Sequence, residues 1–173
     1  MQKLSMAAGV AMIILLAVLI VWQADILGVP EGKLEQDARK AQQVEDSWEV
    51  VRDINGDMCA MLFYDNARRS CTYSIYLTRN GMSYGYFFGQ GGLDAYMVEG
   101  VKGLKFEDKG IALLSLNRDK VCKVVVDNGG LDETITVNPD EPFAIVLPAD
   151  CGEITIYDEE GDIVTLNDTY TGI

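Results

Sequence analysis

The most prominent pattern along the chain is an unbroken apolar run from Met6 to Trp22. As a helix rising 1.5 Å per residue, the run spans about 26 Å, and two flanking residues at each end extend it to about 31 Å. That length matches the hydrocarbon core of a bilayer. The pattern predicts a transmembrane anchor over residues 6–24, after a short tail over residues 1–5.

A cleaved signal peptide is the alternative interpretation of this run. The run is longer than the roughly 7–15 apolar residues of a signal peptide, and no small-x-small cleavage site follows it. The sequence therefore favours an uncleaved signal-anchor.

The charges beside the run predict its orientation. Lys3 precedes it, whereas Asp25 and Glu31 are the first charged residues after it. By the positive-inside rule, the tail is cytoplasmic and the remainder of the chain lies on the other side. We expect a single-pass protein of a bacterial inner membrane with a periplasmic domain.

Three residues of the run are candidates for membrane contacts. Ala7 and Ala11 form a small-xxx-small pair, which lets another helix approach closely, although chance in an alanine-rich segment explains the pair equally simply. Trp22 suits an interfacial anchor. We expect the bilayer and integral membrane subunits as partners.

Residues 25–46 read as a linker with a short helix. Pro30 and Glu31 suit a first helical turn, and Leu34 and Ala38 begin a thin apolar stripe. This pattern predicts either a helical stalk or a helix that rests on the following domain.

From Ser47 onward, short runs of β-branched and aromatic residues alternate with turn residues. The Asn55-Gly56 pair between two such runs is a strong hairpin signal. Spacing of about 8–12 residues without intervening helices predicts an all-β domain over residues 47–173, an antiparallel meander closed as a sandwich or barrel. The expected strands are Trp48–Ile54, Asp57–Tyr64, Cys71–Thr78, Met82–Phe88, Ala95–Glu99, Ile111–Asn117, Lys120–Asp127, Glu133–Val137, Phe143–Leu147, Glu153–Asp158 and Asp162–Asn167.

The aromatic residues of two neighbouring strands alternate with the pleat. Tyr73, Ile75 and Leu77 share one face of their strand, and Met82, Tyr84, Tyr86 and Phe88 share one face of the next. Core packing is the expected role of both sets, and an aromatic platform for a ligand is the alternative.

Charge and composition exclude several classes of function. The chain has 27 acidic and 14 basic residues, for a net charge of −13, and no basic stripe that would suit nucleic acid. It has no histidine, which excludes Ser-His-Asp and Cys-His catalysis within this chain. The acidic turns 158–162 and 140–141 match no EF-hand pattern and suit solvated turns. We expect no enzyme activity, no cofactor and no metal.

The four cysteines, Cys59, Cys71, Cys122 and Cys151, form no CxxC pair. In an exported domain they suggest up to two disulfides, and buried free thiols are the alternative. If Tyr64 pairs with Cys71 across a tight hairpin, Cys59 lies about 17 Å away along the strand. That distance disfavours a Cys59–Cys71 bridge and leaves two pairings open.

Arg68 and Arg69 lie at a predicted hairpin tip in an acidic protein. They are candidates for contacts with a partner's carboxylates, and a solvated turn is the simpler interpretation. Together these features predict a membrane-anchored accessory or assembly subunit of a larger complex (respiratory, photosynthetic, secretion or motility) that acts through protein contacts. The alternative is a free-standing periplasmic ligand-binding or sensor module.

Overall fold

The computed structural model describes residues 12–16, 26–81 and 83–171. The predicted anchor, including Ala7, Ala11 and Trp22, lies outside these residues except for Met12–Leu16, which are helical and exposed. Among the described residues, no helix has both the length and the apolar character needed to cross a membrane.

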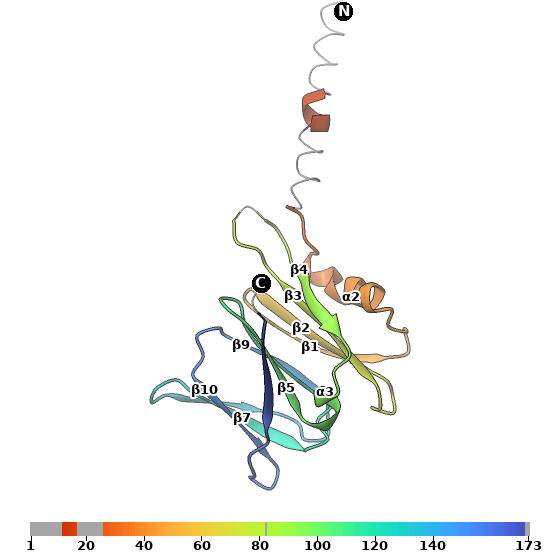
Figure 1. The fold of residues 1–173 in the computed structure, drawn as a ribbon. Helices are drawn as coiled ribbons and strands as arrows, with labels where there is room; N and C mark the ends of the chain where they lie inside the picture. Colours follow the sequence, from red (N-terminus) through yellow and green to blue (C-terminus); the bar gives the residue numbers. More distant parts are fainter. Residues whose placement is uncertain (1–11, 17–25, 82, 172–173) are drawn as a thin grey trace, which may run out of the picture.

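A short helical segment covers the outside of the β domain. The 3-10 turn η1 (Glu31–Lys33) leads into α2 (Leu34–Gln42), which ends where Gln43 adopts a left-handed conformation. The apolar stripe of α2 is fully buried at Leu34 and Ala38. Of the two predicted roles, α2 therefore has the second, because it rests on the domain (Figure 1).

Eleven strands in the described part of the chain form three sheets, which we call the first, central and third sheets. The first sheet has the order β1 (Glu49–Asn55), β2 (Met58–Tyr64), β3 (Cys71–Leu77), β4 (Phe87–Gly92). The central sheet has the order β11 (Leu166–Thr171), β5 (Val101–Phe106), β6 (Gly110–Ser115), β9 (Phe143–Leu147). The third sheet has the order β10 (Glu153–Asp158), β7 (Val121–Asp127), β8 (Asp132–Thr136).

The central sheet is buried on both faces, and this explains the layered arrangement in Figure 1. Leu104, Phe106 and Leu114 pack toward the first sheet, whereas Leu113 and Ile145 pack toward the third. A strand buried on both faces reads as a continuous apolar run, as in β6 and β9. The layers are therefore α2, the first sheet, the central sheet and the third sheet.

Side chains of β1 tie the first sheet to the edge of the central sheet. Val146 of β9 donates its backbone N–H to Asp53 Oδ2 at 2.8 Å, and its carbonyl accepts from Asn55 Nδ2 at 3.2 Å. Both polar backbone groups at this point of the β9 edge are thereby satisfied.

The predicted all-β class and the first hairpin are confirmed. Asn55 pairs with Met58 around Gly56, and the condition that Tyr64 pairs with Cys71 is met. The sheets stack in a sandwich-like arrangement, as predicted, but they do not form one antiparallel meander, because there are three of them in the described residues and β11 pairs with β5 in parallel.

Two predicted strands are also wrong. Ala95–Glu99 contains the one-turn helix α3 (Tyr96–Glu99), and the chain is extended instead in β5, where two lysines mask the alternation. The predicted strand Met82–Phe88 becomes β4 only from Phe87, because the preceding residues pair with the entering chain.

Candidate functional site

The chain enters the β domain through a hydrogen-bonded junction with the β3–β4 loop. Gly28 N and Val29 N donate to Tyr84 O and Tyr86 O, both at 2.7 Å. In return, Tyr84 N donates to Ile26 O and Tyr86 N donates to Val29 O, both at 2.9 Å. We call residues 26–29 and 84–86 the entry clamp, and the end of the domain that holds it the entry end (Figure 1).

Two glycines make this close pairing sterically feasible. A Cβ atom on Gly28 would lie 2.6 Å from Tyr86 O, and one on Gly85 would lie 2.8 Å from Val29 O. Gly85 also has φ of +89°, a conformation that side chains disfavour. The entry clamp therefore requires glycine at both positions.

The aromatic residues of this loop depart from the predicted core packing. Tyr84 is 70% exposed, and Leu27, its bridge partner, is 65% exposed. Phe88 is half exposed and makes an edge contact with Tyr76, with ring centroids 5.6 Å apart. Only Tyr86 packs into the cluster beneath α2, while its hydroxyl donates to Gly56 O at 3.0 Å. The expected core role is therefore confirmed for Tyr86 and wrong for Tyr84, because the entering chain, not a neighbouring sheet, pairs with the loop. It is also wrong for Phe88, which is half exposed on the edge strand β4, and Met82 lies outside the described residues.

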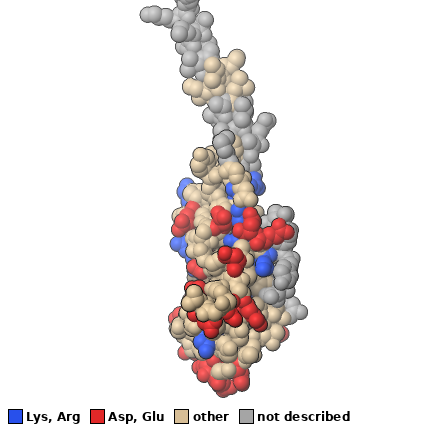
Figure 2. All heavy atoms as spheres, turned by 90° about the vertical axis from the view of Figure 1, so that its left-hand side faces the viewer, with Lys and Arg blue, Asp and Glu red and all other residues tan. Residues whose placement is uncertain are grey.

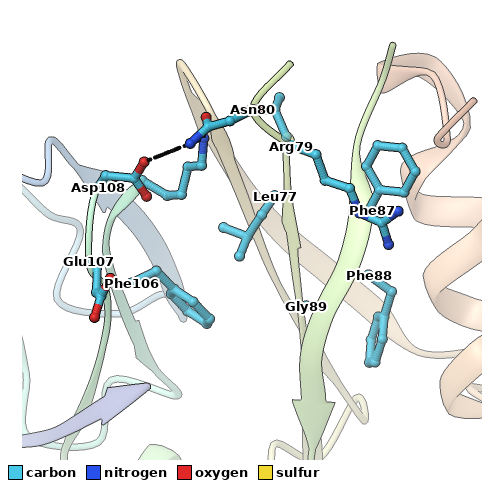
Figure 3. A pocket seen from close by; sticks show the side chains of 11 residues that line it. Leu77, Arg79, Asn80, Phe87, Phe88, Gly89, Phe106, Glu107 and Asp108 are labelled. Carbon is cyan, nitrogen blue, oxygen red and sulfur yellow. Dashed lines mark hydrogen bonds and ion pairs between the residues drawn. The ribbon is translucent and has the colours of Figure 1, made fainter. Parts of the chain in front are cut away.

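A cleft of about 300 Å³ opens beside the clamp, between β3, β4 and the β5–β6 turn. Figure 3 shows Leu77 and Phe106 reaching into the space between the two sheets. Gly89 leaves room there, since a Cβ atom at that position would lie 3.1 Å from Leu77 Cδ1. The floor of the cleft is therefore the apolar end of the core between the first and central sheets.

Polar side chains from three turns form the rim of this cleft. Lys109 Nζ donates to Asn80 Oδ1 at 2.8 Å and lies 3.6 Å from Asp57 Oδ2. Asn80 Nδ2 in turn donates to Asp108 Oδ2 at 3.2 Å, as the dashed line in Figure 3 marks. The ammonium of Lys109 thus joins turns that are distant in sequence.

The electrostatics of the rim follow from these contacts. The Thr78 hydroxyl donates to Asp57 Oδ1 at 2.5 Å and, together with the charge of Lys109, lowers the pKa of Asp57 below its usual value. On the opposite side, the guanidinium of Arg79 lies over the Phe87 ring at 3.9 Å. The arrangement suits an apolar group held under a polar, charge-balanced rim.

The cysteines occupy separate parts of the molecule, and all four are free. Cys59 lies beneath α2 and Cys71 lies on the other face of the first sheet, between the first and central sheets. Burial raises the pKa of Cys59 to about 12 and that of Cys71 to about 11. Cys59 and Cys71 are therefore buried free thiols, which was the alternative to a disulfide.

The other two cysteines lie at opposite ends of the β7–β10 pair. The Cys122 thiol donates to Asp158 O at 3.0 Å, whereas Cys151 precedes Glu153, the partner of Asp127. Roughly seven residues, or about 23 Å, separate these two cysteines along the ladder. The predicted disulfides are thus wrong for this structure, because the three-sheet arrangement distributes the thiols over different layers.

The predicted partner contacts Arg68 and Arg69 lie at the end of the first sheet opposite the entry clamp. Arg68 Nη1 donates to Asp140 O at 2.5 Å, and Arg118 Nη2 donates to Arg68 O at 3.0 Å. Arg68 therefore connects the β2–β3 turn to the β8–β9 loop. Neither arginine is near the cleft, and their role as partner contacts stays a prediction.

One acidic turn brings three carboxylates together. Oxygens of Asp158, Glu160 and Asp162 lie within 4.8 Å of one another, and the last two residues are exposed. Asp158 Oδ1 already accepts from the backbone N–H groups of Glu160 and Asp162, at 3.0 and 2.8 Å. Asp158 therefore shapes its own turn through these two hydrogen bonds.

The cleft itself escaped prediction from sequence. Its turns, Arg79-Asn80-Gly81 and Glu107-Asp108-Lys109, read as separate solvated turns, and nothing local indicates that they meet. No protein-family model matches the chain, and neither a curated protein nor a solved structure is significantly similar to it. The features of the chain that bear on its function are therefore the entry clamp and the cleft beside it.

Proposed function

We propose that this protein is a single-pass, membrane-anchored accessory subunit of a larger membrane complex, with its β domain on the periplasmic side of a bacterial inner membrane. The apolar run from Met6 to Trp22 supplies the anchor, and the flanking charges orient it. The subunit acts by contact and performs no chemistry of its own.

The entry clamp carries this proposal. Four backbone hydrogen bonds tie residues 26–29 to the β3–β4 loop, only a few residues after the apolar run. A flexible tether would let the domain tumble, whereas the clamp holds the chain from Ile26 onward against the domain. Such a short attachment suits a subunit that docks with integral membrane partners beside it.

The cleft favours a second candidate, a membrane-anchored ligand-binding module. Its volume of about 300 Å³ is at the lower limit for small-molecule sites, and its apolar floor with a few polar rim groups is typical of them. The rim groups Asn80 and Lys109 would orient a bound molecule or a partner's side chain.

Native-gel mass spectrometry of source membranes in mild detergent separates the two candidates. An accessory subunit co-migrates with a defined assembly, whose other subunits the spectrum identifies. A 19.0 kDa species that migrates alone in several detergents would overturn the accessory role. Thermal stabilisation of that lone species by a small molecule, lost on filling the cleft with Gly89→Leu, would establish the binding module.

A further inference from the structure

We propose that the entry end rests in the headgroup layer of the bilayer, with Leu27 and Tyr84 as its lipid-contacting side chains. This inference deepens the proposed function and rests on its anchor. The molecules that contact Leu27 and Tyr84 are lipids, at the boundary between headgroups and acyl chains.

Covalent geometry places these residues within reach of that boundary. Leu27 follows Ala24, the last residue of the predicted anchor, by three residues, so the two Cα atoms are at most about 11 Å apart. A headgroup layer is about 5–8 Å thick on each side of the hydrocarbon core. Because Tyr84 pairs with Leu27 in the entry clamp, it is carried to the same depth.

The chemistry of the two side chains suits the interface. Leu27 and Tyr84 are 65% and 70% exposed, although a neighbouring pair of large apolar side chains is normally covered. Tyrosine is enriched where membrane meets water, because its ring is apolar and its hydroxyl is polar. The apolar run ends at Trp22, five residues before Leu27, so the exposed pair lies close to the predicted anchor along the chain.

The opposite end of the molecule provides a matched control. Ile163 is also 70% exposed, but it directly follows the acidic turn that brings the carboxylates of Asp158, Glu160 and Asp162 together. Figure 2 shows Asp and Glu side chains at this lower tip and over much of the rest of the visible face, whereas the visible Lys and Arg side chains lie mainly in the upper half, toward the entry end. Exposure alone thus predicts equal lipid contact at positions 84 and 163, and our proposal predicts contact only at position 84.

Photo-crosslinking of the full chain in phosphatidylcholine vesicles tests this difference. The photoreactive residue p-benzoylphenylalanine replaces Tyr84 in one variant and Ile163 in the other, and flotation of the vesicles reports anchoring. Zwitterionic lipid is chosen because the net charge of −13 would oppose binding to an anionic surface. We expect the intact mass of the position-84 variant to increase by one phosphatidylcholine after irradiation, with no increase for the position-163 variant.

The other outcomes are distinguishable. A chain that does not float overturns the anchor and this proposal together. A floating chain with no lipid adduct at position 84, or with equal adducts at both positions, overturns this proposal alone. So does a protein adduct at position 84 in source membranes without a lipid adduct in vesicles, because the occupant would then be a partner subunit.

Discussion

The two ends of the molecule use polar side chains in different ways. At the entry end, Asp57, Asn80, Asp108 and Lys109 bond across turns that are far apart in sequence. At the opposite end, the carboxylate of Asp158 bonds to backbone N–H groups of its own turn. The first pattern fixes several elements relative to one another, and the second only shapes one hairpin. The acidic turn at the opposite end thus satisfies its own backbone, whereas the fewer polar side chains at the entry end join several turns into one site.

The largest expected loss of stability is for substitutions in the two hydrophobic cores, one on each side of the central sheet. Phe106 is buried beneath the cleft, and Ile156 is buried between the central and third sheets. We expect Phe106→Ala to cost about 3–5 kcal/mol of unfolding free energy and Ile156→Ala about 2–5 kcal/mol. Because the central sheet contributes to both cores, urea unfolding of either variant should show one transition. Two separate transitions in either variant would mean that the ends fold independently.

A matched pair of glycines tests the entry clamp more narrowly. Gly85 and Gly161 have nearly equal φ values of +89° and +88°, but only at Gly85 would a Cβ atom meet another group, Val29 O at 2.8 Å. We expect Gly161→Ala to cost about 1–2 kcal/mol from backbone strain alone. Gly85→Ala should cost about 3 kcal/mol and accelerate hydrogen exchange at Val29 and Tyr86. Equal costs, with unchanged exchange at Val29, would show that the close approach in the clamp is unimportant.

A smaller effect is expected in the titration of the rim. The Thr78 hydroxyl and Lys109 lower the pKa of Asp57, so the ionised form stabilises the fold above the ordinary aspartate pKa, and this contribution is lost as pH falls through the lowered value. Thr78→Val should raise the pKa of Asp57 in an NMR titration of side-chain carboxyl carbons. The stability difference between this variant and the wild type should disappear in acid. Asp140 is the control, since Lys120 lowers its pKa and Thr78→Val should leave that pKa unchanged.

The smallest expected effect is that of reductant. All four thiols are free: Cys59 and Cys71 lie on opposite faces of the first sheet, and Cys122 and Cys151 lie at opposite ends of the β7–β10 pair. Burial raises the pKa of Cys59 and Cys71. Adding dithiothreitol should leave the melting temperature unchanged, and a thiol reagent should label Cys59 only after unfolding. A lower melting temperature on reduction would instead indicate a disulfide.

Local patterns predicted those parts of the fold that neighbours in sequence determine. The hairpin around Asn55-Gly56 follows from turn chemistry, and it is present with Asn55 opposite Met58. The three-sheet stack was missed because a strand buried on both faces has no alternation to read.

The cleft was missed for a different physical reason. Lys109 meets Asn80 and Asp57 only because the central sheet packs against the first sheet, so their contact depends on tertiary packing. The sequence identified the exposed arginines at the opposite end instead, because their charge is visible without the fold.

The proposed function assigns the contacts with bilayer and partner subunits to the entry end and leaves the acidic turn of β10, at the opposite end, in water. Hydrogen–deuterium exchange mass spectrometry of the full chain, in source membranes and again after purification in detergent, tests it most directly. We predict that the β3–β4 loop, residues 78–86, exchanges more slowly in the membranes, while residues 158–163 exchange equally in both preparations. Equal exchange of residues 78–86 in the two preparations, or membrane protection confined to residues 158–163, would contradict the claim.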